Sequence, residues 1–432
     1  MNSGKMFRSK DGHSYAITFV LATTLFLLWG VCNGMIDVLN KHFQNTLNVS
    51  KAQSALVQFS NYMGYFFMAL PAGWLARRFG YKGGILVGLA LIAAGAFWFI
   101  PATSIGTYWA FLVGLFILAT GLTCLETVAN PYTTVLGPPE MAAARINIAQ
   151  SCNGVGWILG PLLGGHFVLS ATGQANRSND TLYLPYLLIG MLVLLLFLAF
   201  LFAKVPDVAA ASEDDGAGAS LASIWKRKHF VAGVAAQFLY VAAQTGIFSF
   251  FINYVVVDLP AIGPAAAALL PNNWTFVQDG VYRITERGAS ALLGGGGFGL
   301  FLAGRIIGSV GLRIWRPQRM LAAYAALNIV LMAAVIGKLG WVSVGALFAS
   351  FFFMSIMFPT IFALGIHGLG VETKKASSYI VMAIVGGAVV PMLMGFIADR
   401  LSMRVGFVVP LICFAGIAAY GASWQRLCAK TR

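Results

Sequence analysis

The sequence predicts an all-α polytopic membrane protein with twelve transmembrane helices in two six-helix halves. Only 10% of its 432 residues are charged and 59% are hydrophobic, which is more apolar surface than a soluble chain of this length can hide. The hydrophobic residues form separate blocks of about 20 or more, the length that a helix needs to cross about 30 Å of hydrocarbon. A polar stretch in the middle of the chain separates six blocks from six others.

Each hydrophobic block is interpreted as one membrane-spanning helix. The predicted spans are 16–40, 52–76, 83–101, 107–135, 143–170, 182–203, 229–257, 289–312, 320–338, 341–367, 376–399 and 405–425. A membrane β-barrel is excluded because its strands need alternating polarity over about ten residues, whereas residues 191–198 are uniformly apolar.

The basic residues behind the net charge of +14 are distributed as expected for a membrane protein. With the N-terminus in the cytoplasm, most Lys and Arg residues fall on cytoplasmic segments, as the positive-inside rule requires. Examples are Arg77, Arg78, Lys226, Arg227 and Lys228. We therefore expect a multi-pass protein of the cell (inner) membrane with both termini in the cytoplasm, embedded in the lipid bilayer. Nucleic acid is not needed as a partner.

Two domains joined by a linker are predicted from the spacing of the spans. Residues 1–204 form the N-terminal six-helix half, residues 205–228 a cytoplasmic linker, and residues 229–432 the C-terminal six-helix half. Each half places a basic turn between its second and third helices, as expected for two structural repeats. The segment 258–290 is unusually long and rich in proline, so we expect an external loop there.

Two acidic residues, Asp37 and Glu126, lie well inside predicted spans. A carboxylate at such depth costs about 2.5 to 3.5 kcal/mol on insertion scales, and proton exchange is the simplest reason to retain it. Two structural alternatives remain. Asp37 is near the external end of its span and can reach water beside Lys41 and His42, and Glu126 can be a hydrogen-bonded structural acid.

Amide side chains recur at helical spacing near these acids, which places each set on one helix face. In five spans the pattern comprises Asn33 with Asp37; Gln58 with Asn61; Glu126 with Asn130; Asn147 with Gln150 and Asn153; and Gln237 with Tyr240 and Gln244. Hydrogen bonds between helices are the alternative explanation for any single amide. Five polar faces favour a hydrated central cavity.

Amides, carboxylates and aromatic rings are the groups that bind sugars, because hydroxyls donate and accept hydrogen bonds while pyranose faces pack on rings. Trp29, Tyr65, Trp157 and Phe248 are the aromatic candidates, with ordinary core packing as their alternative. Neither a nucleophile arrangement nor a metal-ligand cluster is found, so we expect no enzyme activity and no cofactor. The glycine runs at 83–84, 294–297 and 386–387 are not preceded by a predicted strand, so they are not phosphate-binding loops.

Several motifs give the chain a family resemblance over nearly its whole length. They are Leu28-Trp29-Gly30, Asp37-Val38-Leu39, Gly121-Leu122-Thr123-Cys124-Leu125-Glu126-Thr127-Val128-Ala129-Asn130-Pro131, Val135-Leu136-Gly137-Pro138, Ala149-Gln150-Ser151-Cys152-Asn153, Pro359-Thr360-Ile361-Phe362 and Ser377-Ser378-Tyr379-Ile380-Val381-Met382. The chain resembles the fucose-galactose-glucose:proton symporters of the major facilitator superfamily. The block from Leu125 to Pro131 is the most specific of these motifs.

The resemblance implies the major facilitator fold and a proton-coupled monosaccharide symporter that imports L-fucose or a related hexose by alternating access. It also implies that Asp37 and Glu126 are paired carboxylates for proton coupling, with Glu126 also contacting sugar. Asn33, Gln58, Asn61, Asn130, Gln150, Asn153 and Gln244 complete the predicted sugar-binding set. The partners are then a monosaccharide and protons, and we expect a monomer.

Two alternatives are kept. The first is transport of glucose, galactose or N-acetylglucosamine, including a sodium-coupled form. The second is a proton-drug antiporter, against which the five polar faces argue, because such a protein should have a broad apolar cavity.

Overall fold

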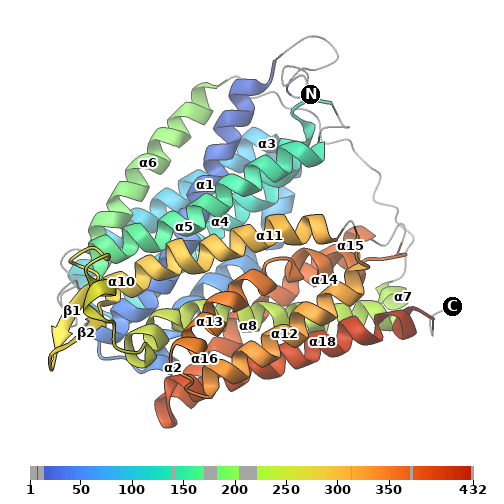
Figure 1. Cartoon of the computed structure of the whole chain (residues 1–432). Coiled ribbons are helices and arrows are strands. Elements are labelled where there is room, and N and C mark those ends of the chain that lie inside the picture. Colours follow the sequence, from blue (N-terminus) through green and yellow to red (C-terminus); the bar gives the residue numbers. More distant parts are fainter. Residues whose placement is uncertain are drawn as a thin grey trace. The chain divides into compact units, whose positions relative to one another are not determined.

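The protein is mostly helical, as predicted. The computed structural model describes residues 7, 14–138, 142–169, 182–203, 221–312, 314–369 and 373–429. Figure 1 shows long helices throughout these ranges and one small hairpin of two strands. Asn147, Arg77 and Pro131 lie in helices, but their side chains fall outside the described ones.

The described residues of the first half of the sequence form six helices. They are α1 (Ala16–Thr46), α2 (Lys51–Ser54), α3 (Leu56–Ile105), α4 (Tyr108–Val135), α5 (Ala142–Val168) and α6 (Tyr183–Phe202). The long α3 comprises two of the predicted spans, because the backbone leaves helical geometry at Gly80, with φ of 70°. Only glycine adopts this conformation readily, so Gly80 creates the basic turn predicted between the second and third spans.

The second half contains shorter and more interrupted elements. They are α7 (Leu221–Lys226), α8 (Lys228–Asp258), α9 (Pro264–Ala267), β1 (Thr275–Gln278), β2 (Val281–Ile284), α10 (Glu286–Ala291), the π-helix η3 (Leu292–Phe298), α11 (Gly299–Gly311), α12 (Pro317–Ile336), α13 (Trp341–Met354), α14 (Met357–Gly365), α15 (Thr373–Met382), the 3₁₀ turn η5 (Ala383–Val385), α16 (Gly386–Arg400), α17 (Met403–Gly406) and α18 (Val408–Ala429).

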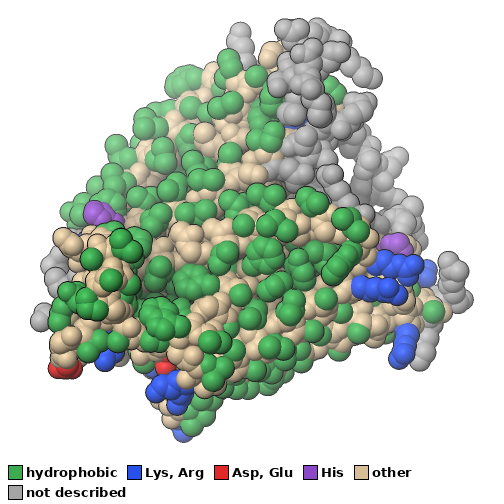
Figure 2. Space-filling view, viewed as in Figure 1, with side chains coloured by type: hydrophobic (Ala, Val, Ile, Leu, Met, Phe, Trp, Pro, Cys, Tyr) green, Lys and Arg blue, Asp and Glu red, His purple; other side chains and the backbone are tan. Residues whose placement is uncertain are grey.

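Ten helical stretches of the described residues are long and apolar enough to cross a membrane. The other two predicted spans, 52–76 and 143–170, are helical as the first part of α3 and as α5. Polar residues such as Gln58, Asn61, Gln150 and Asn153 lower the hydropathy of these two. Figure 2 shows hydrophobic side chains across the outer faces of helices, as expected for a surface in contact with lipid.

Close backbone approach joins α1 to α5 in the first of two compact units, which comprises residues 1–47, 60–169 and 176–213. Gly30 faces Gly156, and Gly34 faces Gly160, so closely that a Cβ atom at any of these positions would collide with the neighbouring backbone. Small residues allow such approach between membrane helices. This contact fixes the side of α1 that carries Asn33 and Asp37 relative to α5.

The second compact unit comprises residues 48–59, 170–175 and 214–432. Within it α8 is buried along much of its length and packs against α14, α16 and α18. The short α2 also belongs to this unit and packs against α16. The Asp399 carboxylate of α16 accepts hydrogen bonds from the backbone N–H groups of Lys51 (3.0 Å) and Ala52 (2.9 Å).

Two features of the second unit go beyond what the sequence predicted. The expected external loop 258–290 contains an antiparallel hairpin, in which Thr275 pairs with Ile284 and Gln278 with Val281. Part of the expected linker 205–228 is helical, as α7, and the rest of it up to residue 220 lies outside the described residues. The glycine run at 294–297 lies in the π-helix η3, where Gly296 and Gly297 pack against the rings of Phe348 and Phe351.

Candidate functional site

A hydrogen-bonded group of three side chains joins α1 to α3. The Trp29 indole N–H donates to the hydroxyl oxygen of Tyr65 at 2.6 Å, and the Asn33 amide donates to the same oxygen at 3.3 Å. The Asn33 amide also donates to the carbonyl oxygen of Trp29 at 3.0 Å. The rings of Trp29 and Tyr65 and the amide of Asn33 are therefore held in fixed orientation between α1 and α3.

Glu126 lies on α4, close enough to Tyr65 for an electrostatic interaction. Its side chain is half-buried, and its carboxylate makes no hydrogen bond or ion pair within the described part of the chain. The structural alternative for Glu126, a carboxylate satisfied by protein donors, therefore finds no support there. Such a group keeps its lone pairs for a ligand or a proton.

An amide pair lies one helical turn further along α4. The Gln150 amide of α5 donates to the side-chain oxygen of Asn130 at 3.0 Å, and the Asn130 amide donates to the carbonyl oxygen of Glu126 at 3.0 Å. Both side chains are half-buried. The pair therefore presents oriented amides next to Glu126 while one bond between them fixes their geometry.

Asn153 lies elsewhere, although three-residue spacing predicted one face for it and Gln150. It is buried, and its amide donates to the carbonyl oxygen of Phe26 on α1 at 3.2 Å. A step of three residues rotates a helical side chain by about 60° from its predecessor. That rotation directs Gln150 toward α4 and Asn153 toward α1.

Asp37 and Asn61 are both only 2% exposed. Asp37 lies on α1 one turn after Asn33 and interacts with other groups of the protein. The side-chain oxygen of Asn61 on α3 has no hydrogen-bond partner among the described residues, which is costly for a buried acceptor. Asn61 therefore has an unused acceptor in the interior.

The remaining predicted polar residues belong to the second unit. Gln58 is buried, with a partner of its own, and Gln244 on α8 is half-buried. Gln237 is fully buried and neither atom of its amide has a hydrogen-bond partner among the described residues, while the Tyr240 hydroxyl donates to the carbonyl oxygen of Met354 at 3.0 Å. Of the polar face predicted on this helix, Gln244 alone is more than slightly exposed.

The other two aromatic candidates, Phe248 and Trp157, lie outside the hydrogen-bonded group of Trp29, Asn33 and Tyr65. Phe248 is buried and stacks on Phe351, with ring centroids 4.8 Å apart, so it is a core residue as its alternative stated. Trp157 is half-buried on α5 beside the close contact with α1.

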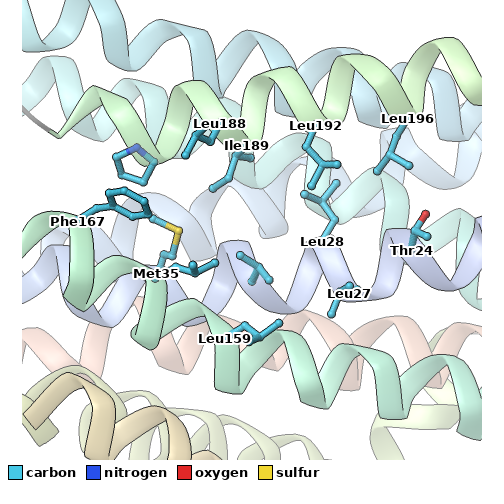
Figure 3. Close-up of a pocket in the computed structure, with 13 residues that line it drawn as sticks. Thr24, Leu27, Leu28, Met35, Leu159, Phe167, Leu188, Ile189, Leu192 and Leu196 are labelled. Carbon is cyan, nitrogen blue, oxygen red and sulfur yellow. The ribbon is translucent and has the colours of Figure 1, made fainter. Parts of the chain in front are cut away.

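An apolar cavity of about 390 Å³ lies between α1, α5 and α6. Figure 3 shows its lining, which includes Met35, Leu159, Phe167 and Leu192, with Thr24 as the single polar side chain. The Thr24 hydroxyl already donates to the carbonyl oxygen of Leu21. This cavity offers a sugar almost no hydrogen bonds and contains none of the predicted site residues.

Arg145 is a buried charge that the sequence analysis did not assign to the site. Its guanidinium donates to the carbonyl oxygens of Thr133 (3.0 Å), Pro138 (3.1 Å) and Gly137 (3.3 Å) at the end of α4. It thereby supports the chain that follows Asn130. The sequence did offer a signal for it, because Arg145 is a basic residue in the first turn of the predicted span 143–170.

The helices define a multi-pass membrane protein, with an acid, Glu126, that has no ion pair to the described residues inside one of its spans. The model of the Major Facilitator Superfamily matches residues 15–383. The chain is 37% identical over 417 residues to the glucose/galactose transporter of Brucella abortus (strain 9-941), covering 96% of this chain and 95% of that protein. It is 37% identical over 431 residues to the L-fucose-proton symporter of Escherichia coli K12, covering 94% and 93%.

A crystal structure of the E. coli fucose:proton symporter has a TM-score of 0.65 to this chain at 35% identity, covering 95% of this chain and 99% of that one. The chain belongs to the Major Facilitator Superfamily and, within it, to the family of fucose-galactose-glucose:proton symporters. The resemblance noted in the sequence is thereby confirmed.

Proposed function

We propose that this protein is a proton-coupled monosaccharide symporter that imports L-fucose or a related hexose by alternating access. The observation that carries the proposal is the Glu126 carboxylate, which lies within a membrane span without a protein partner among the described residues. The two relatives support it, because one is named for L-fucose and protons and the other for glucose and galactose.

Glu126 is suited to binding sugar and proton at the same site. An ionised carboxylate accepts hydrogen bonds from sugar hydroxyls, whereas a protonated one can donate one and accept others. A charged group in a membrane span is costly, so protonation lowers the cost of closing the site around the bound sugar. Sugar binding and protonation at Glu126 therefore favour one another.

Asp37 is proposed as the second coupling carboxylate. It is almost completely buried on α1, so its access to water has to change during the transport cycle for it to exchange protons. Residues 1–204 and 229–432 are proposed to be the halves whose rocking provides this change. Asp37 then handles the proton, while Glu126 contacts both proton and sugar.

The neutral side chains around Glu126 are proposed to recognise the sugar hydroxyls and the apolar sugar face. Asn130 and Gln150 offer oriented amides from α4 and α5, and Asn33 and Tyr65 offer further polar atoms from α1 and α3. The Trp29 ring, fixed by its bond to Tyr65, is the candidate surface for a pyranose face. Asn61, Gln58 and Gln244 complete the proposed set, whereas the predicted sugar ligand Asn153 is now proposed to support the site by joining α5 to α1.

The protein is proposed to reside in the inner membrane as a monomer, with both termini in the cytoplasm. The distribution of Lys and Arg along the sequence supports this orientation. Sugar and protons then enter from the external side. Lipid is the only other partner that the proposal requires.

The proposal is tested by uptake of radiolabelled sugars into proteoliposomes with and without an inward proton gradient. We expect saturable, gradient-driven accumulation of L-fucose first, and of galactose or glucose next. Accumulation driven by a sodium gradient instead would contradict proton coupling. Transport of lipophilic cations without any of these sugars would replace the proposal by an antiporter.

A further inference from the structure

Arg305 is a cation on α11 within the membrane-spanning stretch 286–311. An arginine at such depth is costly and needs a functional or structural reason. Among the described residues, no carboxylate forms an ion pair with Arg305. Its positive charge is therefore not balanced by a neighbouring acid in this part of the protein.

The side chain of Arg305 points to a break in a neighbouring helix. Its Nε donates to the carbonyl oxygen of Ser355 at 3.5 Å, the long limit of a hydrogen bond. Ser355 lies between the end of α13 at Met354 and the start of α14 at Met357, in the middle of the span 341–365. Arg305 is thus directed toward mid-membrane backbone and not along its own helix toward the cytoplasm.

The face of α11 that carries Arg305 is turned toward protein. Gly304 packs against Phe352 and Ser355, and Gly308 packs against Ile356, whereas Ile306 and Ile307 are 61% and 57% exposed. The guanidinium carbon lies 5.2 Å from the ring centroid of Phe301, one turn earlier on the same face. An aromatic ring and a cation therefore share one interior face of α11.

The hydrogen-bonding capacity of Arg305 is mostly unused. A guanidinium has five N–H donors, and here only Nε has an acceptor, so the two terminal nitrogens make no hydrogen bond to the described residues. Arg305 is half-buried, and its terminal nitrogens are not among the fully buried side-chain atoms that lack a partner, so they remain accessible to a ligand. Tyr240 is close enough for an electrostatic interaction but uses its hydroxyl hydrogen on Met354.

Broken helices near the membrane midplane are where secondary transporters place their substrates. Free backbone carbonyls at such breaks are tolerated where they face a cavity or are satisfied by other groups. At this break, Tyr240 and Arg305 supply two of those donors. The two terminal nitrogens of the planar Arg305 guanidinium can donate hydrogen bonds to two oxygen atoms on adjacent carbons of one sugar ring.

We propose that Arg305 is a sugar-binding residue of the C-terminal half, whose terminal nitrogens donate hydrogen bonds to two adjacent hydroxyls of the transported hexose. This inference rests on the proposed function and adds a cationic hydrogen-bond donor, which the predicted set of amides and carboxylates does not contain. Of the residues in that set, Gln244 alone lies within α8 to α18.

The test measures sugar binding by calorimetry on the full-length, detergent-purified protein. The probes are L-fucose, galactose and glucose, followed by analogues of the best ligand in which one hydroxyl at a time is replaced by hydrogen. The variants are Arg305→Gln, which removes the charge, and Arg305→Lys, which keeps the charge but loses the fork. Arg319→Gln, at an exposed arginine on α12, is the matched control.

For wild type we expect two adjacent hydroxyl positions at which deletion weakens binding about tenfold or more, as for hydrogen bonds to a charged group. Arg305→Gln should bind the parent sugar about tenfold or more weakly and become indifferent to deletion at those two positions. Arg305→Lys should remain sensitive at one of them. Arg319→Gln should match wild type throughout.

Two results would overturn the inference. One is wild-type affinity in Arg305→Gln, and the other is an unchanged pattern of hydroxyl sensitivity in both Arg305 variants, which would show that Arg305 acts without touching sugar. The second criterion holds even if overall affinity falls through a loss of stability, because it compares analogues on the same protein. If wild type binds none of the sugars, the proposed function fails instead, and the wild-type measurements alone reveal that.

Discussion

The Gln150 amide lies 3.0 Å from the side-chain oxygen of Asn130, one turn of α4 beyond Glu126. This bond fixes which atoms of the two amides remain available to a ligand. The Gln150 amide uses one lone pair of the Asn130 side-chain oxygen, and the Asn130 amide donates to the backbone carbonyl of Glu126. The Gln150 oxygen and the other Asn130 lone pair are left for sugar hydroxyls.

Gln150→Leu should therefore weaken sugar binding by about three- to tenfold, because it removes a ligand acceptor and frees the Asn130 side chain to rotate. The unfolding temperature should change little, since Gln150 is half-buried and its loss leaves Asn130 accessible to water. Calorimetry with the transported sugar, together with a thermal melt, checks both expectations. Unchanged affinity would remove Gln150 from the sugar-binding set.

Asn153→Ala should show the opposite balance, with a larger loss of stability than Gln150→Leu. Its amide bonds the Phe26 carbonyl within the tight contact between α1 and α5, and we expect a loss of about 1 kcal/mol. Thermal unfolding in detergent measures it, and sugar affinity is recorded on the same sample. A strong loss of affinity without any loss of stability would make Asn153 a direct sugar ligand.

The Asp399 carboxylate stabilises the first turn of α2 through two backbone N–H groups, and the Lys51 ammonium lies 3.4 Å from it. Asp399→Asn leaves one oxygen where two accept, and it removes a negative charge from the positive end of a helix. We expect a loss of about 1 kcal/mol in unfolding free energy. The measurement is the unfolding midpoint in detergent.

Asp279→Asn is the matched control, because Asp279 is exposed in the hairpin turn, where its φ of 52° suits asparagine equally well. Equal effects of the two substitutions would show that the Asp399 contact adds nothing to stability.

Asp37→Asn should abolish accumulation of sugar against a gradient and leave exchange of sugar across the membrane. A neutral amide cannot carry a proton through the cycle, whereas a buried amide of similar size preserves the packing of α1. Uptake and counterflow in the same proteoliposomes separate the two activities. Full proton-driven accumulation by this variant would exclude Asp37 from coupling.

The sequence predicted the helices well because lipid imposes a length and an apolar composition on each of them. Helical spacing also placed Asn130 one turn after Glu126, and in the structure the Asn130 amide donates to the backbone carbonyl of Glu126 at 3.0 Å. Spacing within one helix does not say which neighbouring helix a face meets, and so Gln150 and Asn153 were assigned to one surface although they contact different helices.

Contacts between distant segments could not be predicted from the sequence for a related reason. The cap that Asp399 provides to α2 joins residues more than 300 positions apart, and nothing local to either segment signals it. The hairpin at 275–284 was hidden by the prolines and polar residues that marked a loop. Arg305 was visible as a charge inside a span, but its direction toward the break at Ser355 required the structure.

The binding role of Glu126 is examined by calorimetry on purified Glu126→Ala and Glu126→Gln. Glu126→Ala should weaken sugar binding by about tenfold or more, because a charged hydrogen-bond acceptor is lost. Glu126→Gln should bind sugar better than Glu126→Ala, since its amide still accepts a hydrogen bond. Wild-type affinity in Glu126→Ala with a much lower melting temperature would make Glu126 a structural residue.

Coupling of sugar to protons at Glu126 is tested most directly by sugar-induced proton entry. Proteoliposomes containing a pH-sensitive dye are given external sugar without any imposed gradient. Wild type should acidify the lumen when sugar is added, whereas Glu126→Gln should catalyse sugar exchange in counterflow without acidification, because its amide cannot carry a proton. Acidification by Glu126→Gln at the wild-type ratio of protons to sugar would exclude Glu126 as the coupling residue.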